Sequence, residues 1–153
     1  ADGLAQEELA RGQGGLAHAL EDLGARMSAD GGPSVNVFVA PDVPEQVDAV
    51  VAEHLYRIAQ ESVTNAVRHS GAGGIRVTLE LDGARGALRL AVLDDGRGMP
   101  TGAEARAGLG LKLMQYRAEQ IGGELHAGPG PVGGTRIECA CPLRSAAPPS
   151  ASA

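Results

Sequence analysis

Apolar residues recur along much of this chain at the spacing of an α-helix. Residues 16–27 carry leucines and small apolar residues three and four positions apart, and a longer stripe of the same kind runs over 45–69. A third helix is predicted over 109–121. The second and third stretches are each followed by a cluster of glycines, which is typical of a helix C-terminus. The pattern therefore predicts three helices, of which the middle one is the longest.

Between these stretches, apolar and polar residues alternate one by one. Such alternation predicts a short strand over 35–39 and a hairpin of 75–82 with 88–92 around a glycine-containing turn. A last hairpin joins 124–127 to 134–142 across the sequence Gly-Pro-Gly-Pro. Strands that are polar on one side are typical of antiparallel sheets with one face open to water. We therefore predict a two-layer α/β sandwich, in which a mixed, mostly antiparallel sheet carries helices on one face.

The length of 153 residues favours one domain with a sizeable core. Residues 1–15 are rich in glycine and polar side chains, and we interpret them as an N-terminal extension or the end of a linker. Residues 16–143 form the predicted domain. Residues 144–153 are too poor in apolar side chains to pack, so we predict a disordered tail.

Composition and charge restrict the class of protein. The chain is 43% hydrophobic and 21% charged, which is ordinary for a soluble globular domain. The formal net charge of −6, without a block of lysines and arginines, predicts no nucleic-acid surface. No apolar run is long enough to span a bilayer and the N-terminus carries no secretion signal, so we expect a cytoplasmic domain without membrane contact, whose longer parent could still be anchored elsewhere. Cys139 and Cys141 are interpreted as reduced core residues on one strand face.

Three polar side chains share one face of the long predicted helix. Glu61, Asn65 and His69 are spaced four residues apart and therefore stack along one side. One amide oxygen of Asn65 would suffice to hold Mg²⁺ beside nucleotide phosphates, because Mg²⁺ prefers oxygen ligands and keeps several waters. Glu61 could then orient a metal-bound water or accept a proton, and Arg68 and His69 could contact phosphate oxygens. The alternatives are a solvated face for Glu61 with Asn65 and, for His69, a favourable contact with the helix dipole.

A second polar segment follows the predicted strand that ends near Asp94. Gly96 and Gly98 allow a backbone conformation and a close approach that residues with side chains do not permit. A buried carboxylate at this turn could accept a hydrogen bond from the exocyclic amine of adenine. The alternative is an ordinary Asp-Gly turn, but such a turn does not account for two glycines spaced two residues apart and followed by a second glycine pair.

Two further glycine steps complete the set. Gly108 and Gly110 open a predicted helix, whose free backbone amides form a natural cradle for phosphates. Lys112 in its first turn could add a cation near the terminal phosphate, although a solvated surface lysine is the more ordinary interpretation. Thr135, after a pair of glycines, offers a hydroxyl to the adenine pocket, or it only starts a strand. The chain has no P-loop sequence, no complete dinucleotide fingerprint and no protein-kinase His-Arg-Asp loop.

The order and spacing of these segments resemble the ATP-binding domain of sensor histidine kinases. Their superfamily also contains gyrase, the heat-shock chaperone ATPase and the mismatch-repair clamps. Residues 55–69 are similar to the N box of the subfamily that pairs with response regulators carrying helix-turn-helix output domains. Residues 94–99 resemble the G1 box, 108–111 the G2 box and 133–135 the last glycine step. The resemblance covers about residues 16–143.

The resemblance implies a Bergerat-type ATP-binding fold with ATP and Mg²⁺ as cofactors. It implies that Glu61 and Asn65 serve the metal and the chemistry, that Asp94 binds adenine, and that residues 99–107 form an ATP lid. The full set of nucleotide contacts that it implies is Asn65, Arg68, His69, Asp94, Gly96, Gly98, Met99, Gly108, Leu109, Gly110, Leu111, Lys112 and Thr135.

The implied reaction is transfer of the ATP γ-phosphoryl group to a histidine. In this family the acceptor histidine is followed by an acid, and none of the four histidines of this chain is. The resemblance therefore implies a catalytic domain whose acceptor lies in a separate dimerisation domain of the parent chain, with a cognate response regulator as the further partner. Two alternatives stay open: a stand-alone serine kinase that also binds a sigma factor, and a degenerate module kept for partner binding.

Overall fold

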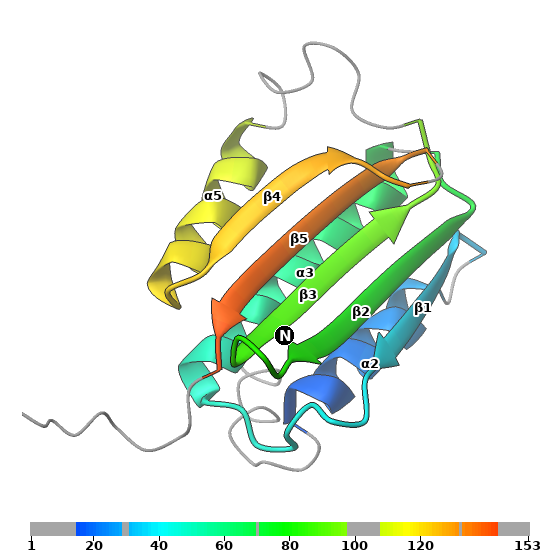
Figure 1. Ribbon diagram of the computed structural model, residues 1–153. Coiled ribbons are helices and arrows are strands. Elements are labelled where there is room, and N and C mark those ends of the chain that lie inside the picture. Colours follow the sequence, from blue (N-terminus) through cyan, green and yellow to red (C-terminus); the bar gives the residue numbers. More distant parts are fainter. Residues whose placement is uncertain (1–14, 29–30, 70, 98–107, 132, 144–153) are drawn as a thin grey trace, which may run out of the picture.

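The computed structural model describes residues 15–28, 31–69, 71–97, 108–131 and 133–143. Within these residues the chain forms three helices and five strands (Figure 1). In chain order they are α2 (Gly15–Met27), β1 (Ser34–Val39), α3 (Ala49–His69), β2 (Gly74–Asp82), β3 (Ala87–Asp94), α5 (Gly108–Gln120), β4 (Glu124–Pro129) and β5 (Thr135–Pro142). The predicted lid and the predicted tail lie outside the described residues.

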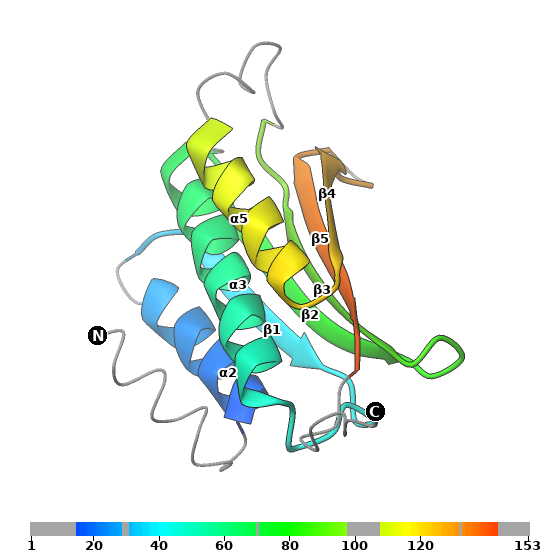
Figure 2. The same cartoon turned by 90° about the vertical axis from the view of Figure 1, so that its left-hand side faces the viewer.

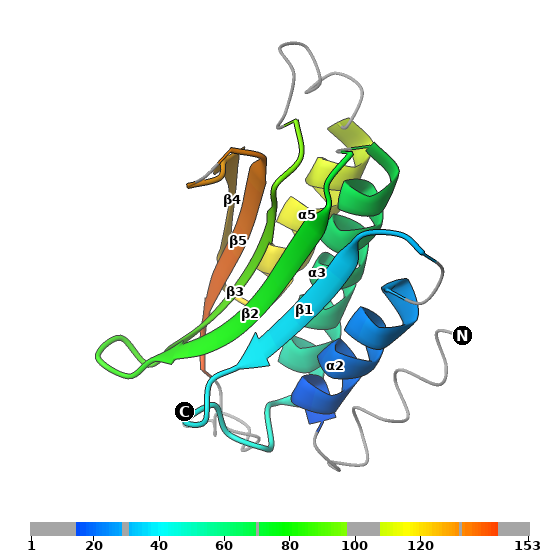
Figure 3. The same cartoon turned by 90° about the vertical axis from the view of Figure 1, so that its right-hand side faces the viewer.

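The five strands form one sheet in the order β1-β2-β3-β5-β4. Strand β1 pairs with β2 in parallel, and the other neighbours are antiparallel. All three helices cover the same face of the sheet, and none of the described elements covers the opposite face (Figures 2 and 3). The predicted two-layer sandwich with a mixed, mostly antiparallel sheet is confirmed.

The core lies between the sheet and α3, which is the middle helix of the layer (Figure 2). The predicted apolar stripe of this helix faces the sheet, because Val51, Leu55 and Ile58 are almost completely buried. They pack against the inward-facing residues of the strands, which alternate with exposed polar residues on β2. With a single phenylalanine in the chain, which is itself exposed, the core consists mainly of aliphatic side chains.

The long helix begins at Ala49 rather than at residue 45. Asp48 precedes it, and its carboxylate accepts hydrogen bonds from the backbone amides of Val50 at 3.1 Å and Val51 at 3.2 Å. Aspartate in this position satisfies amides that the first helical turn leaves unpaired, so it fixes the start of the helix. Val47, which the apolar period includes, lies before the helix and is half-buried against the core.

The core contains both cysteines of the chain. Cys139 and Cys141 are buried free thiols on one strand, as predicted. Burial and the neighbouring Cys141 raise the pKa of the Cys139 thiol to about 12.

His54 lies on α3, and its ring nitrogen Nδ1 is buried without a hydrogen-bond partner in the described part of the chain. Burial lowers the pKa of His54 and the positive charge of Arg117 on α5 lowers it further, while the charge of Glu53 opposes both.

Candidate functional site

The C-terminal half of α3 faces the first turn of α5. Glu61 and Asn65 are both half-buried on α3. A Cβ atom placed on Gly110 would lie 3.2 Å from Oε2 of Glu61 and 3.7 Å from Nδ2 of Asn65. The structure thus brings together the predicted acid, the predicted amide and the second glycine of the helix that follows the predicted lid. A side chain at position 110 would crowd the carboxylate, which explains why a glycine suits this turn.

Ser62 holds the two helices in this arrangement. Its hydroxyl donates a hydrogen bond to the Ile58 carbonyl at 2.8 Å, and its Oγ lies 3.2 Å from Sδ of Met114 on α5. Ser62 is itself buried. Because Ser62 directly follows Glu61, α3 and α5 are in contact beside the position that carries the carboxylate.

Asp94 ends β3 and is only 9% exposed. Its Oδ1 accepts a hydrogen bond from the backbone amide of Gly96 at 2.9 Å, so the turn that follows the strand orients the carboxylate. The predicted position of this aspartate at the end of a strand is therefore what the structure shows. Ile75 at the start of β2 pairs with Asp94, and α3 ends only a short connection before β2. The C-terminus of α3 and the end of β3 consequently lie at the same edge of the sheet.

The start of β5 lies directly against Asp94. Gly134 has a φ of +75°, and a Cβ atom there would overlap the carbonyl oxygen of Asp94 and lie 3.0 Å from its Oδ1. Only glycine fits such a conformation and contact without strain. Leu93 pairs with Arg136, so the half-buried Thr135 begins β5 beside the aspartate.

Asp95, which sequence reasoning treated only as part of the turn, has a specific partner. Its carboxylate Oδ1 accepts hydrogen bonds from the backbone amides of Gly73 at 2.9 Å and Gly74 at 3.1 Å. Gly73 lies in the connection from α3 to β2, and Gly74 is the first residue of β2. The predicted hairpin carried no register, so the sequence analysis missed this contact. The observed register, which pairs Ile75 with Asp94, brings Gly74 opposite Asp95.

The other predicted residues are placed less specifically. Arg68 and Lys112 are exposed, which matches the interpretation of Lys112 as a surface residue. Leu111 packs partly against the core, and Gly96 is half-buried. The structure describes His69, Gly108 and Leu109 only as helical backbone, and Gly98 and Met99 lie outside the described residues.

The donor atoms present fit a magnesium ion that is held mainly by phosphates and water. The described residues contain no group of three or more His, Cys, Asp and Glu side chains that could hold a metal by themselves. Asn65 and Glu61 offer an amide oxygen and a carboxylate from one helix face, and Mg²⁺ commonly uses one or two protein ligands beside substrate phosphates.

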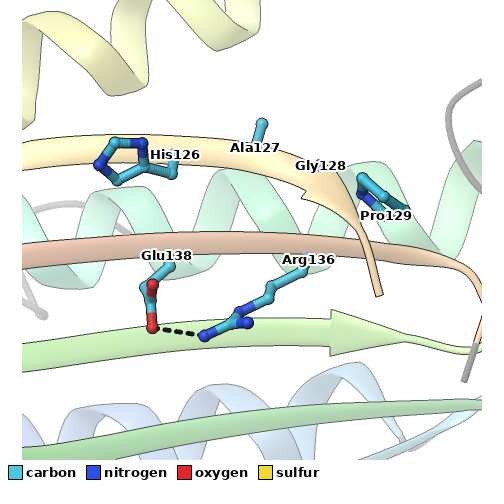
Figure 4. Close-up of a pocket in the computed structure, with 6 residues that line it drawn as sticks. All are labelled: His126, Ala127, Gly128, Pro129, Arg136 and Glu138. Atoms are coloured by element: carbon cyan, nitrogen blue, oxygen red, sulfur yellow. Dashed lines mark hydrogen bonds and ion pairs between the residues drawn. The ribbon is translucent and has the colours of Figure 1, made fainter. Parts of the chain in front are cut away.

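A separate shallow hollow of about 210 Å³ lies on β4 and β5 (Figure 4). His126 on β4 borders it, together with Arg136 and Glu138 on β5, which are joined by a hydrogen bond of 2.8 Å. Arg136 and Glu138 alternate with residues that pack on the core, so they belong to the open face of the sheet. This hollow is therefore distinct from the cluster around Asp94 and Asn65.

The family described as "Histidine kinase-, DNA gyrase B-, and HSP90-like ATPase" matches residues 50–145. This match covers well over half of the chain and every candidate residue named above. The chain belongs to this ATPase family. No helix in the described part of the chain is long and apolar enough to cross a membrane.

Relatives of this ATPase-family domain include sensor proteins. Sensor protein VraS of Staphylococcus saprophyticus is 39% identical over 110 residues, which make up 71% of this chain and 31% of that protein. Among solved structures, the ATP binding domain of PrrB from Mycobacterium tuberculosis gives a TM-score of 0.60 at 26% identity, covering 81% of this chain and 93% of that domain. Full-length ShkA in complex with AMPPNP gives a TM-score of 0.64 at 27% identity, covering 86% of this chain and 30% of the ShkA chain. The chain thus spans less than a third of the sensor proteins that it matches, and the predicted resemblance to histidine-kinase ATP-binding domains is confirmed.

Proposed function

We propose that this domain binds Mg-ATP and is the catalytic domain of a sensor histidine kinase. The observation that carries the proposal is that a buried aspartate and a pair of Mg²⁺-compatible side chains stand at one edge of the sheet. Asp94, enclosed by Gly96 and Gly134, suits the exocyclic amine of adenine. Glu61 and Asn65, beside the first turn of α5, suit the metal and the phosphates. The ATPase family and the AMPPNP complex of ShkA support the same nucleotide.

The proposed reaction transfers the γ-phosphoryl group of ATP to the imidazole of an acceptor histidine. Such a transfer needs positioning and charge neutralisation more than covalent chemistry from the protein. The free amides of the first turn of α5 would bind phosphate oxygens. Asn65 would hold Mg²⁺, which neutralises phosphate charge when bound, and Glu61 would orient a water or accept a proton at its carboxylate. Because ATP is supplied in the cytoplasm, we place the domain there, and a membrane-anchored parent is compatible with this assignment.

We further propose that the acceptor histidine belongs to a dimerisation domain of the parent chain. Such a domain must approach the phosphate end of the nucleotide. Leu113 and Tyr116 lie one turn apart on α5, directly after the glycine pair, and are 47% and 56% exposed. Exposed large apolar side chains that lie together are typical of docking surfaces. A response regulator would then receive the phosphoryl group from the acceptor.

Titration calorimetry with ATP in the presence of Mg²⁺ or EDTA tests the nucleotide and metal assignments. The wild-type domain should bind Mg-ATP, and Asn65→Ala should lower this affinity at least about tenfold, the effect of losing one ligand to a charged group. In EDTA the two proteins should bind ATP alike. Asn36→Ala, which removes an exposed asparagine on β1, is the matched control and should behave as wild type. No binding by the wild type would refute the proposed function, whereas equal Mg-ATP affinity of wild type and Asn65→Ala would refute only the metal role.

A further inference from the structure

Two side chains of the turn after β3 reach across to the connection between α3 and β2. A single oxygen of Asp95, Oδ1, accepts hydrogen bonds from the backbone amides of Gly73 at 2.9 Å and Gly74 at 3.1 Å. Its own backbone amide donates to the Gly74 carbonyl at 3.3 Å, so main chain and side chain bind the same short segment. The guanidinium group of Arg97 lies 3.7 Å from the position that a Cβ atom of Gly71 would occupy.

This contact joins the two halves of the proposed nucleotide site. The connection that it holds begins where α3 ends, and α3 carries Glu61 and Asn65. The turn that holds it begins at Asp94, the residue immediately before Asp95. The distance between the adenine end and the metal end of the site therefore depends on how firmly the connection is fixed to the turn. A ligand that contacts both ends gains affinity only when that distance is already correct in the free protein.

We propose that Asp95 is a positioning residue for ATP. It sets the spacing between Asp94 and the phosphate-facing end of α3, and it touches neither adenine nor phosphate. This inference rests on the proposed function. It predicts that Asp95 matters for ligands that span both halves of the site and matters little for ligands that fill the adenine half alone.

The chain provides a matched control at the other end of the same hairpin. Asp82 ends β2, and its Oδ1 accepts the backbone amide of Arg85 at 3.2 Å in the turn to β3. Asp82 and Asp95 are thus the same residue type with the same kind of bond to the backbone, but only Asp95 adjoins the site. A purely structural role would give Asp95→Ala and Asp82→Ala the same consequences for ligand binding.

The test compares ATP affinity by calorimetry in Mg²⁺ with adenosine affinity by NMR titration. In Asp95→Ala, which removes two charge-assisted hydrogen bonds, ATP affinity should fall at least about tenfold and adenosine affinity less than about threefold. Asp95→Asn retains an acceptor oxygen for both amides and should restore ATP affinity to within about threefold of wild type. Asp82→Ala should leave both affinities unchanged, whatever it does to the melting temperature.

Three results would overturn the assignment. If Asp95→Ala lowered the affinities for ATP and adenosine by the same factor, the residue would support only the adenine half of the site. If Asp82→Ala lowered the affinity for ATP as much as Asp95→Ala does, the effect would be a general one of hairpin stability. Failure of Asp95→Asn to restore binding would show that accepting the two amides is not what matters. Wild-type protein that does not bind ATP would refute the proposed function and this role together, which separates it from the three results above.

Discussion

Replacing Gly134 by alanine is expected to damage the nucleotide site from a position that bears no functional side chain. A Cβ atom at this position would overlap the carbonyl oxygen of Asp94, lie 2.6 Å from its carbonyl carbon and lie 3.0 Å from its Oδ1. The overlapping atom belongs to the backbone of β3, so it cannot turn aside as the end of a long side chain could. Either the start of β5 or the end of β3 must move. A shift of β3 displaces the Asp94 carboxylate, and a shift of β5 removes the backbone that lies against it.

An alanine at the neighbouring Gly133 is the control for backbone strain, because it has a similar backbone conformation without the steric contact. Gly133 has a φ of +94° and Gly134 one of +75°, but a Cβ atom on Gly133 would meet nothing within 4 Å. An alanine in this left-handed region costs about 1–2 kcal/mol, and overpacking adds about 1–3 kcal/mol. Gly133→Ala should therefore lower the free energy of unfolding by about 1–2 kcal/mol and Gly134→Ala by about 2–5 kcal/mol. At about 4 °C per kcal/mol for a domain of this size, the melting temperatures should fall by about 4–8 °C and 8–20 °C.

Urea denaturation followed by circular dichroism measures the free energies, and calorimetry with Mg-ATP measures binding to the folded variants. We expect Gly133→Ala to bind ATP as wild type does and Gly134→Ala to bind at least about tenfold more weakly, equivalent to about 1.4 kcal/mol. Equal stability of the two variants would refute the steric reasoning. A Gly134→Ala protein with reduced stability but unchanged ATP affinity would refute the assignment of Asp94 to adenine.

Two further predictions concern the helical layer. Because the pKa of His54 is lowered from its ordinary value of 6.5, the unfolded chain takes up a proton at higher pH than the folded one, so the free energy of unfolding should fall as the pH decreases from 7.5 to 5. Urea denaturation should show that the free energy of unfolding falls less with pH in His54→Gln than in the wild type. In the exposed control His18→Gln it should fall as much as in the wild type. Identical decreases in all three proteins would contradict the burial argument. In a protein that joins this domain to its acceptor domain, Leu113→Ser with Tyr116→Ser should slow autophosphorylation at least about tenfold while leaving Mg-ATP affinity unchanged, because the lost apolar contact affects docking only. Unchanged autophosphorylation would remove α5 as the docking surface.

The fold was largely predictable because its elements are governed by local patterns. The hairpins have one buried and one solvated face, so strict alternation marks them. The α3 helix has a long stripe whose residues are buried as expected. The start of α3 was placed too early, because the apolar period continues through Val47 while the capping bonds of Asp48 decide where helical hydrogen bonding begins. Periodicity measures which side chains are buried, and a half-buried loop residue satisfies it as well as a helical one.

The site depends on contacts between segments far apart in the sequence, and these were only partly predictable. Asp94 and Gly134 are forty residues apart and meet because β5 inserts between β3 and β4, an order that no local pattern encodes. The glycine step before Thr135 was identified as part of the site only through the family resemblance. The structure supplies the physical reason, since the carbonyl of Asp94 occupies the space that any side chain at 134 would need. The contact of Asp95 was missed because the hairpin was predicted without a register. Only the observed register, which places Ile75 opposite Asp94, brings Gly74 opposite Asp95. A charged residue that opposes a pair of glycines across a predicted hairpin is therefore worth testing as a backbone ligand before it is treated as a turn residue.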